Sequence, residues 1–188
     1  TSLTKMAYGG IYDQIGGGFS RYSVDNRWHI PHFEKMLYDN AQLVSVYSKA
    51  YLQDKNELYK NIVKETLAFV NDELNANNGA FYSSLDADSK NENNELEEGV
   101  FYTWTKQELK ALIKDYKLFA NYYNVNTTGF WENDLYVLIR DQSVTEFAKK
   151  NKLTKDELKQ KIADWKSTLT LARNKRNKPN LDDKILTS

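Results

Sequence analysis

The stretch GGFSRYSV at residues 17–24 decides how this sequence is interpreted. Apolar and polar side chains alternate after the two glycines, which is typical of a short β-strand. The turn-forming residues DNR at 25–27 follow, and WHIP at 28–31 is the expected returning strand. A helical pattern starts directly afterwards. The stretch therefore predicts a β-hairpin that leads into a helix.

The same arrangement recurs twice further along the chain. GAFYSSL at 79–85 opens a second strand, an acidic loop occupies 86–98, and VFYTW at 100–104 is the returning strand. A weaker third copy begins with GFW at 129–131 and returns at 135–139. We interpret these segments as a degenerate repeat of helix, Gly-Phe β-hairpin and helix. Such units have to pack side by side, because one helical hairpin cannot bury its own apolar face.

Helices account for most of the remaining sequence. Apolar residues at three- and four-residue spacing predict helices over 33–52, after Pro31, and over 57–75, before Asn77-Asn78-Gly79. Three later helices start with a hydroxyl residue and a Glu three positions on, at Thr105/Glu108, Ser143/Glu146 and Thr154/Glu157. The last of them extends to Ala172. The predicted fold class is mainly α, with antiparallel α-hairpins and small β-hairpins.

The composition predicts a packed globular chain and excludes several classes of protein. Of the 188 residues, 40% are hydrophobic and 13% aromatic, enough for a sizeable core in one domain or one large piece of a domain. The 26 Lys and Arg balance the 26 Asp and Glu, whereas a binder of nucleic acid or of a membrane surface usually has one charge in excess. The absence of cysteine excludes disulfides and thiolate metal sites within the chain. No apolar run approaches the roughly 20 residues of a membrane span, and without a recognisable signal peptide we expect a cytoplasmic location.

Several longer motifs resemble one known family. They are GGIYDQIGGGF at 9–19, RYS at 21–23, PHFEKMLYDN at 31–40, LDADS at 85–89, EGVFYTW at 98–104 and DDKILT at 182–187. Together they resemble the YyaL-like family, also called the thioredoxin-domain-containing, spermatogenesis-associated family. The motifs extend over essentially the whole chain, and the first is long and unusual.

The resemblance implies a piece of a larger architecture. Members of that family combine an N-terminal thioredoxin-fold domain with a six-hairpin α/α toroid, the architecture of sugar 2-epimerases and several glycosidases. Residues 1–188 resemble about the first half of the toroid, as one partial domain without the thioredoxin-like domain or the remaining hairpins. Half of a toroid would leave an apolar seam exposed, so we expect either self-association through that seam or marginal stability.

In such a toroid the β-hairpins and connecting loops gather at one mouth, where a ligand pocket is expected. The candidate catalytic residues are those able to transfer protons: His32, Asp39, Asp86 and Asp88. The candidate substrate-binding residues offer a sugar either charge or a ring face: Arg21, Tyr22, Trp28, Glu34 and Trp104. On a helix starting near His32, Asp39 would share the face of His32, and Glu34 would lie on nearly the opposite side. That geometry disfavours a single pocket built from all three.

Structural explanations compete with these assignments. Glu34 can be a first-turn carboxylate that faces the helix dipole, and His32 can make a structural hydrogen bond. Asp86 and Asp88 alternate so that they share one side of a strand end, but they can equally belong to a solvated loop. The same holds for the acidic run that follows, Glu92, Glu95, Glu97 and Glu98. An EF-hand is excluded, because Lys90 stands in the loop and no glycine follows.

Two further signals are weak. GGG at 16–18 resembles a phosphate loop, but no Lys-Ser/Thr follows and the segment enters a strand. A basic patch follows the last helix, where positive charge is favourable in itself, and it has no interleaved aromatic residues: Arg173, Lys175, Arg176 and Lys178. We therefore expect no nucleotide, nucleic-acid or membrane partner.

Two hypotheses about function remain open. The first is a carbohydrate-active domain, epimerase-like or glycosidase-like, in which His32 transfers a proton, a carboxylate is its partner, and aromatic rings bind a small sugar. The second is a non-catalytic scaffold or binding module that accompanies a thioredoxin-like domain. We predict no metal and no other cofactor in either case.

Overall fold

A computed structural model describes residues 1–76 and 78–185. The helices are α1 (Ser2–Tyr8), α2 (Leu37–Asp54), α3 (Glu57–Glu73), α4 (Lys106–Leu112), α5 (Tyr116–Tyr122), α6 (Val144–Lys150) and α7 (Lys155–Arg173). The strands are β1 (Tyr22–Ser23), β2 (Pro31–His32), β3 (Lys35–Met36), β4 (Ser84–Leu85), β5 (Asp88–Lys90), β6 (Leu96–Glu98), β7 (Trp104–Thr105), β8 (Leu135–Tyr136) and β9 (Leu181–Asp182). The described chain is mainly α, as predicted, with small antiparallel sheets. Asn77 of the predicted helix stop and Leu186-Thr187 of the last motif lie outside the described residues.

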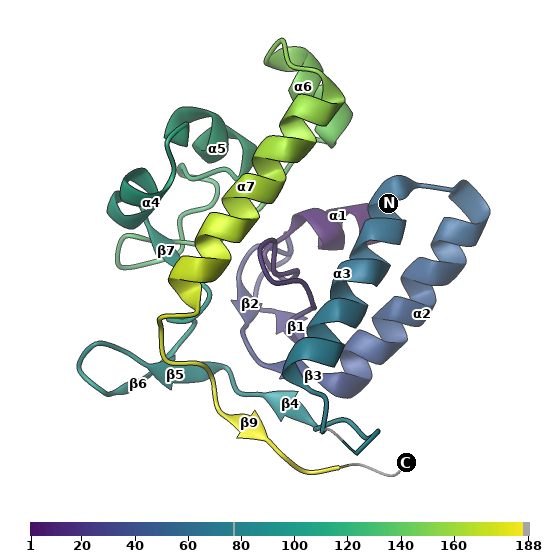
Figure 1. Cartoon of the computed structure of the whole chain (residues 1–188), viewed down its shortest axis with the longest axis vertical. Coiled ribbons are helices and arrows are strands. Elements are labelled where there is room, and N and C mark those ends of the chain that lie inside the picture. The colour runs from purple at the N-terminus through teal and green to yellow at the C-terminus, as the bar shows by residue number, and fades with distance from the viewer. Residues whose placement is uncertain (77, 186–188) are drawn as a thin grey trace.

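Two groups of helices make up the molecule (Figure 1). In the N-terminal group, α2 and α3 form an antiparallel hairpin and α1 packs against α3. In the C-terminal group, the 19-residue helix α7 packs with α4, α5 and α6 around one core. After α7 the chain turns back, and β9 joins β4 and β3 in a three-stranded sheet. The end of the chain thereby lies against strands from its first half.

Each group of helices has an aromatic core. In the C-terminal group, the Trp165 ring of α7 meets the Phe119 ring of α5 edge-on at 5.4 Å. In the N-terminal group, the Phe19 ring stacks on Tyr47 at 5.5 Å, and Tyr59 meets Tyr47 edge-on at the same distance. All five side chains are buried. Because such ring pairs contribute about 0.5–1.5 kcal/mol beyond their burial, much of the high aromatic content serves to hold each group together.

The predictions for the later helices are confirmed. α3 and α7 occupy the ranges expected from the periodic apolar residues. The hydroxyls of Ser143 and Thr154 accept from the backbone N–H three residues on, and the glutamates there accept from the cap backbone in return. Thr105 caps α4 through the N–H of Glu108. These helix starts were predictable because they depend on only four consecutive residues.

The helix predicted from residue 33 begins only at Leu37. Residues 31–36 are extended instead, with β2 paired to β1 and β3 paired to β4. Their burial alternates strictly, and Pro31, Phe33 and Lys35 face inward. The prediction was wrong here because the third inward-facing residue is a lysine, which hides the two-residue period of a strand.

The first predicted hairpin is confirmed, whereas the second pairs differently. β1 and β2 are antiparallel, with Tyr22 opposite His32. β4 does not pair with residues 100–104, because it lies between β3 and β9. The acidic loop instead contains the hairpin β5–β6, whose turn is held by the Asn91 side-chain oxygen, which accepts from two backbone N–H groups. β8 is the expected returning strand of the third predicted hairpin, and it pairs with β7.

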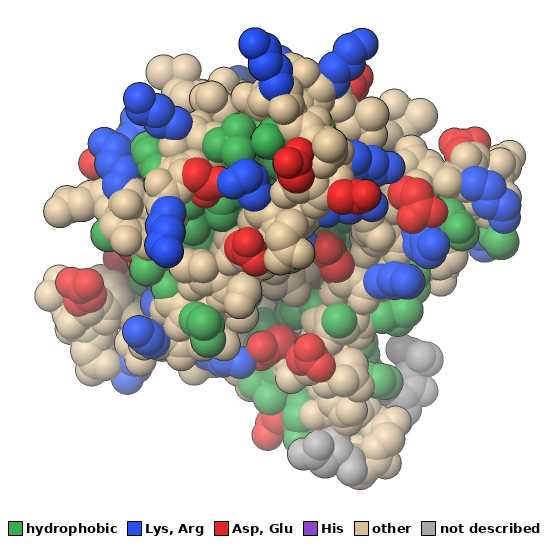
Figure 2. All heavy atoms as spheres, turned by 45° about the horizontal axis from the view of Figure 1, so that its top comes forward, with side chains coloured by type: hydrophobic (Ala, Val, Ile, Leu, Met, Phe, Trp, Pro, Cys, Tyr) green, Lys and Arg blue, Asp and Glu red, His purple; other side chains and the backbone are tan. Residues whose placement is uncertain are grey.

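Charges of both signs are interspersed over the face shown in Figure 2, and neither sign gathers into one large patch there. This distribution agrees with the formal net charge of zero. Within residues 1–76 and 78–185, no helix combines the length and the hydropathy required to cross a bilayer.

Candidate functional site

The imidazole of His32 lies between two carboxylates. Its Nδ1 is 2.8 Å from Oε1 of Glu98, and its Nε2 is 3.8 Å from Oε2 of Glu34. The ring of Tyr22 stacks on the imidazole with the centroids 4.9 Å apart. The side chain of His32 is 28% exposed, so water and small molecules can reach it. We call His32, Glu34 and Glu98, together with Arg21 and Tyr22, the His32 cluster.

The backbone places each member of the His32 cluster. The pairing of β1 with β2 sets Tyr22 opposite His32, which brings their side chains to one face. Glu98 arrives from the end of β6, and its Oε1 also accepts from the backbone N–H of Phe33 at 3.2 Å. The carboxylate is therefore fixed by two contacts. Because an ionised carboxylate only accepts hydrogen bonds, Nδ1 of His32 carries the shared proton, and Nε2 carries a lone pair whenever the ring is neutral.

Glu34 joins this cluster, contrary to the prediction that it would lie away from His32. Residues two apart in an extended segment share a side, and residues 31–36 are extended. Arg21 donates to Oε2 of Glu34 at 3.1 Å, so Glu34 stands between Arg21 and His32. The hydrogen bond that Arg21 donates to Glu34 raises the pKa of Arg21.

The three aspartates named as candidates lie around the same strands. Asp88 is opposite Glu98 in the β5–β6 ladder. Burial raises the pKa of Asp88, and the negative charges of Asp86 and Glu98 raise it further. Burial also raises the pKa of Asp39, and the positive charge of Arg21 opposes this effect. Oδ2 of Asp39 is buried and has no hydrogen-bond partner among the described residues. Asp39 and Asp88 are thus disposed to hold a proton at a higher pH than an exposed aspartate does.

The two candidate tryptophans, Trp28 and Trp104, lie outside the His32 cluster. Trp28 has a positive φ of 63° and packs with the buried N-terminal core. Its backbone oxygen accepts from Gly10 N–H at 2.7 Å, and a side chain at Gly9 would collide with it. Trp104 is fully buried, with the guanidinium of Arg176 4.0 Å above its ring. Trp104 therefore exposes no ring face on which a sugar could stack in this structure.

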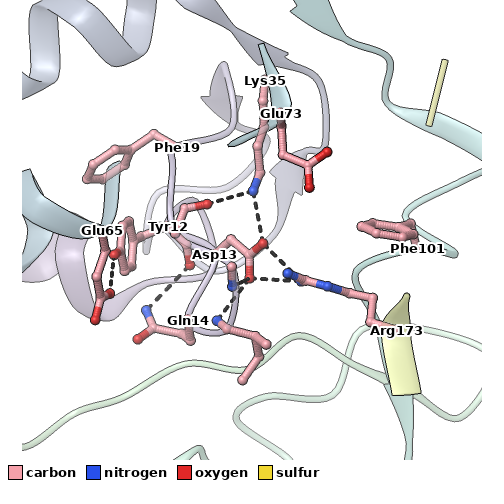
Figure 3. Close-up of polar contacts among 12 residues, drawn as sticks. Tyr12, Asp13, Gln14, Phe19, Lys35, Glu65, Glu73, Phe101 and Arg173 are labelled. Atoms are coloured by element: carbon pink, nitrogen blue, oxygen red, sulfur yellow. Dashed lines mark hydrogen bonds and ion pairs between the residues drawn. The ribbon is translucent and has the colours of Figure 1, made fainter. Parts of the chain in front are cut away.

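A second cluster of charges, which the sequence analysis did not identify, is buried (Figure 3). Nζ of Lys35 is 2.9 Å from Oδ2 of Asp13, and Nη1 of Arg173 lies 2.9 and 3.1 Å from the two oxygens of the same carboxylate. Only 2% of the Lys35 side chain, 7% of Arg173 and 9% of Asp13 are exposed. Lys35 also donates to the carbonyl of Gly17 at 2.8 Å. We call Asp13, Lys35 and Arg173 the Asp13 cluster.

The Asp13 cluster joins distant parts of the chain around the glycine-rich loop. Oδ1 of Asp13 accepts from the backbone N–H groups of Ile15 and Gly16. Burial raises the pKa of Asp13, but the charges of Arg173 and Lys35 outweigh burial and hold the pKa well below its usual range. Asp13 is consequently ionised, and it fixes the loop against β3 on one side and the end of α7 on the other. Nothing in the local sequence signals a partner so far away.

The predicted basic patch after α7 is largely taken up inside the molecule. Arg173 belongs to the Asp13 cluster. Nη1 of Arg176 donates to three backbone carbonyls between residues 100 and 103, and its Nη2 pairs with Glu108 at 2.7 Å. Lys178 pairs with Glu73 of α3 at 2.8 Å. These cations tie the C-terminal segment to the rest of the fold and do not form a free basic surface.

No group of three or more His, Asp or Glu side chains in the described part of the chain has an arrangement that could hold a metal ion. The two carboxylates beside His32 can act on its ring nitrogens by hydrogen bonding and charge. This arrangement can orient an imidazole, stabilise its protonated form and leave one nitrogen available for proton exchange.

Comparison with known proteins gives relatives much longer than this chain. The protein named Uncharacterized protein B0495.5, from Caenorhabditis elegans, is 36% identical over all of this chain, and the match covers 28% of the nematode protein. Spermatogenesis-associated protein 20 from Homo sapiens and from Mus musculus is 46% and 47% identical over 115 residues, which are 61% of this chain and 15% of those proteins. No family model matches the chain. The chain is thus similar to spermatogenesis-associated protein 20, in agreement with the resemblance in its motifs, and spans less than a third of the length of these relatives.

Proposed function

We propose that this chain is about half of a six-hairpin α/α toroid and carries a proton-transfer site for a sugar, with His32 as the group that moves the proton. The contact between Nδ1 of His32 and Glu98 at 2.8 Å is the observation that supports this proposal most strongly. It leaves Nε2 of the neutral ring with a lone pair, and the His32 side chain is 28% exposed. The proposal rests also on the resemblance to a family with a toroid.

Proton abstraction of the epimerase type fits these groups best. Nε2 would take a proton from the sugar, Glu98 would stabilise the resulting imidazolium, and Nε2 would then return the proton to the sugar. Arg21 is held beside the imidazole by Glu34 and can offset negative charge that develops on the substrate. Asp39 and Asp88, whose pKa values are raised, are the additional acids for a glycosidase-like variant of the reaction.

The remaining walls of the sugar pocket come, in this proposal, from the rest of the toroid. Several large apolar side chains of the helices are exposed in the described chain, and they would meet the rest of the toroid or a second copy: Val46, Leu52, Leu67 and Leu171. The degree of exposure is large for aliphatic residues on helices, with Leu52 at 67% and Leu171 at 66%. Exposed apolar surface of this kind typically marks an interface.

Deuterium incorporation tests the proposal directly. Unlabelled aldoses, ketoses and N-acyl amino sugars are incubated in D₂O with the full-length protein, and NMR follows the loss of carbon-bound protons. We expect one class of sugar to exchange, and His32→Gln to slow the exchange by about 100-fold or more while the melting temperature stays nearly unchanged.

Glu92→Gln is the matched control. Glu92 is an exposed acidic residue of the β5–β6 hairpin, which also carries Glu98, and it lies outside the His32 cluster. It should leave the exchange rate unchanged. If no sugar exchanges, or if His32→Gln exchanges at the parental rate, the non-catalytic scaffold is the better description. If His32→Gln lowers the melting temperature strongly, His32 has a structural role instead.

A further inference from the structure

A cavity of about 550 Å³ lies between the two groups of helices, away from the His32 cluster. Its walls come from α1 and α3 on one side, and from α6, α7 and the end of α5 on the other. The volume is within the range of small-molecule sites. Neither the proposed sugar chemistry nor the Asp13 cluster uses this cavity.

Arg140 is the unusual group in its wall. Its Nη1 donates to the hydroxyl of Tyr122 at 2.9 Å, and its guanidinium lies 4.6 Å from the centre of the Tyr8 ring. Nε of Arg140 is buried without a hydrogen-bond partner, and no carboxylate of the described residues forms an ion pair with this guanidinium. A guanidinium taken out of water without an anion is costly. An anionic ligand in the cavity would supply the counter-charge that no carboxylate of the described residues provides.

The other charged residues of the cavity leave an excess of positive charge. Lys155 and Lys159 are exposed and lie one turn apart on α7, at the edge of the cavity. Lys159 has a weak contact with Asp156 at 3.7 Å. Glu65 is already neutralised, because it pairs with Lys166 at 2.7 Å and accepts from the hydroxyl of Tyr12 at 2.5 Å.

One exposed carboxylate, that of Glu57, remains in the wall, and it pairs with Lys60 at 3.5 Å. Arg140 and the two lysines of α7 therefore set the sign of the potential in the cavity. A cavity with two or three unpaired or weakly paired positive groups in its wall suits a dianion better than a single carboxylate.

We propose that this cavity binds a small phosphate ester, with the phosphate on the guanidinium of Arg140 and the carbon body against the rings of Tyr8 and Tyr122. The planar donors of arginine match phosphate oxygens in pairs. Lys155 and Lys159 at the edge attract the dianion and contribute a salt-dependent part of the affinity. The site is independent of turnover at His32.

Isothermal titration calorimetry on the 188-residue chain tests this with four probes: glucose 6-phosphate, glucose, gluconate and inorganic phosphate. We expect glucose 6-phosphate to bind more tightly than the other three. Arg140→Gln should weaken its binding about tenfold or more, since it removes a charge-assisted pair of hydrogen bonds. Lys155→Gln/Lys159→Gln should weaken binding several-fold and flatten its dependence on salt.

The matched control is Lys149→Gln/Lys150→Gln, which removes the same charge from exposed positions of the neighbouring helix α6 outside the cavity. It should leave the affinity unchanged. If Arg140→Gln does not fold, the affinities of Lys155→Gln/Lys159→Gln and of the control decide whether the proposal holds. Three results would overturn the proposal. Glucose 6-phosphate does not bind, gluconate binds more tightly than it does, or Lys149→Gln/Lys150→Gln loses as much affinity as Lys155→Gln/Lys159→Gln.

Discussion

The six residues 31–36 supply both charged clusters, one on each side of the backbone. His32 and Glu34 do not face inward, and both belong to the His32 cluster. Lys35 faces inward and contacts Asp13. The contacts with carboxylates are nearly equal in length, at 2.8 Å from Glu98 to His32 and 2.9 Å from Asp13 to Lys35. What differs is access to water, since 28% of the His32 side chain is exposed and only 2% of Lys35.

This comparison shows how burial decides what an ionic contact does. In the interior, removing one charge leaves its partners unpaired in a medium that solvates them poorly. At the surface, water compensates for the loss, so the contact contributes little to stability but can orient a group that exchanges protons. We therefore expect the Asp13 cluster to contribute to stability, and the chemistry proposed above to depend on the His32 cluster.

The largest effect is expected from Asp13→Asn, which leaves Lys35 and Arg173 buried without an anion. Loss of one partner from a buried ion pair costs about 3–5 kcal/mol. Urea denaturation followed by tryptophan fluorescence measures this loss. Asp134→Asn, at an exposed position with no ion-pair partner among the described residues, is the control and should change stability by about 0.5 kcal/mol or less. A loss near 1 kcal/mol for Asp13→Asn would show that the Asp13 cluster is less important than its geometry suggests.

The second expected effect is a loss of folding stability at low pH. The folded pKa of Asp13 lies well below its usual range, because the attraction of Arg173 and Lys35 exceeds the opposing effect of burial. Its stabilising contribution is therefore complete above the unfolded pKa of about 3.9 and is lost as the pH falls from there through the lower folded pKa. Thermal midpoints at a series of pH values between 6 and 2 should show the parent and Asp13→Asn converging below about pH 4. A gap that stays constant down to pH 2 would contradict this origin of the stability.

The smallest change in stability is expected for Glu98→Gln in the His32 cluster, about 1 kcal/mol or less. Its informative readout is the tautomer of His32, measured from the nitrogen chemical shifts of the ring. In the parent, Nδ1 donates to Glu98, and the variant should populate both tautomers because an amide can donate as well as accept. Glu97→Gln, one residue away and hydrogen-bonded to Asn91, is the control. An unchanged tautomer would mean that Glu98 does not orient the imidazole.

Local features of the fold were predictable from the sequence, and distant pairings were not. The caps at Ser143 and Thr154 depend on neighbouring residues, so their spacing was sufficient. The pairing of β4 with β9 joins residues almost a hundred positions apart, and no turn between them fixes its register. The acidic loop was expected to be unstructured because its hairpin is built from charged residues without an apolar face.

The candidate site was partly predictable for a similar reason. His32, Arg21 and Tyr22 were selected by their chemistry, and the β1–β2 hairpin does bring them together. Glu98 was assigned to a solvated run of acidic residues, since only the hairpin β5–β6 carries it to His32. Arg173 was assigned to a basic patch because a sequence does not show which cations find a buried partner.

The long separation in sequence between Asp13 and Arg173 has a consequence for synthesis on the ribosome. The glycine-rich loop and β3 are made early, but Asp13 cannot meet its second cation until α7 has been completed. Strand β9, which completes the sheet of β3 and β4, follows α7. Asp13 thus stays without its second cation until 160 further residues have been made, and contacts of such long sequence separation form slowly. The helices of the N-terminal group can assemble before α7 and β9 join them.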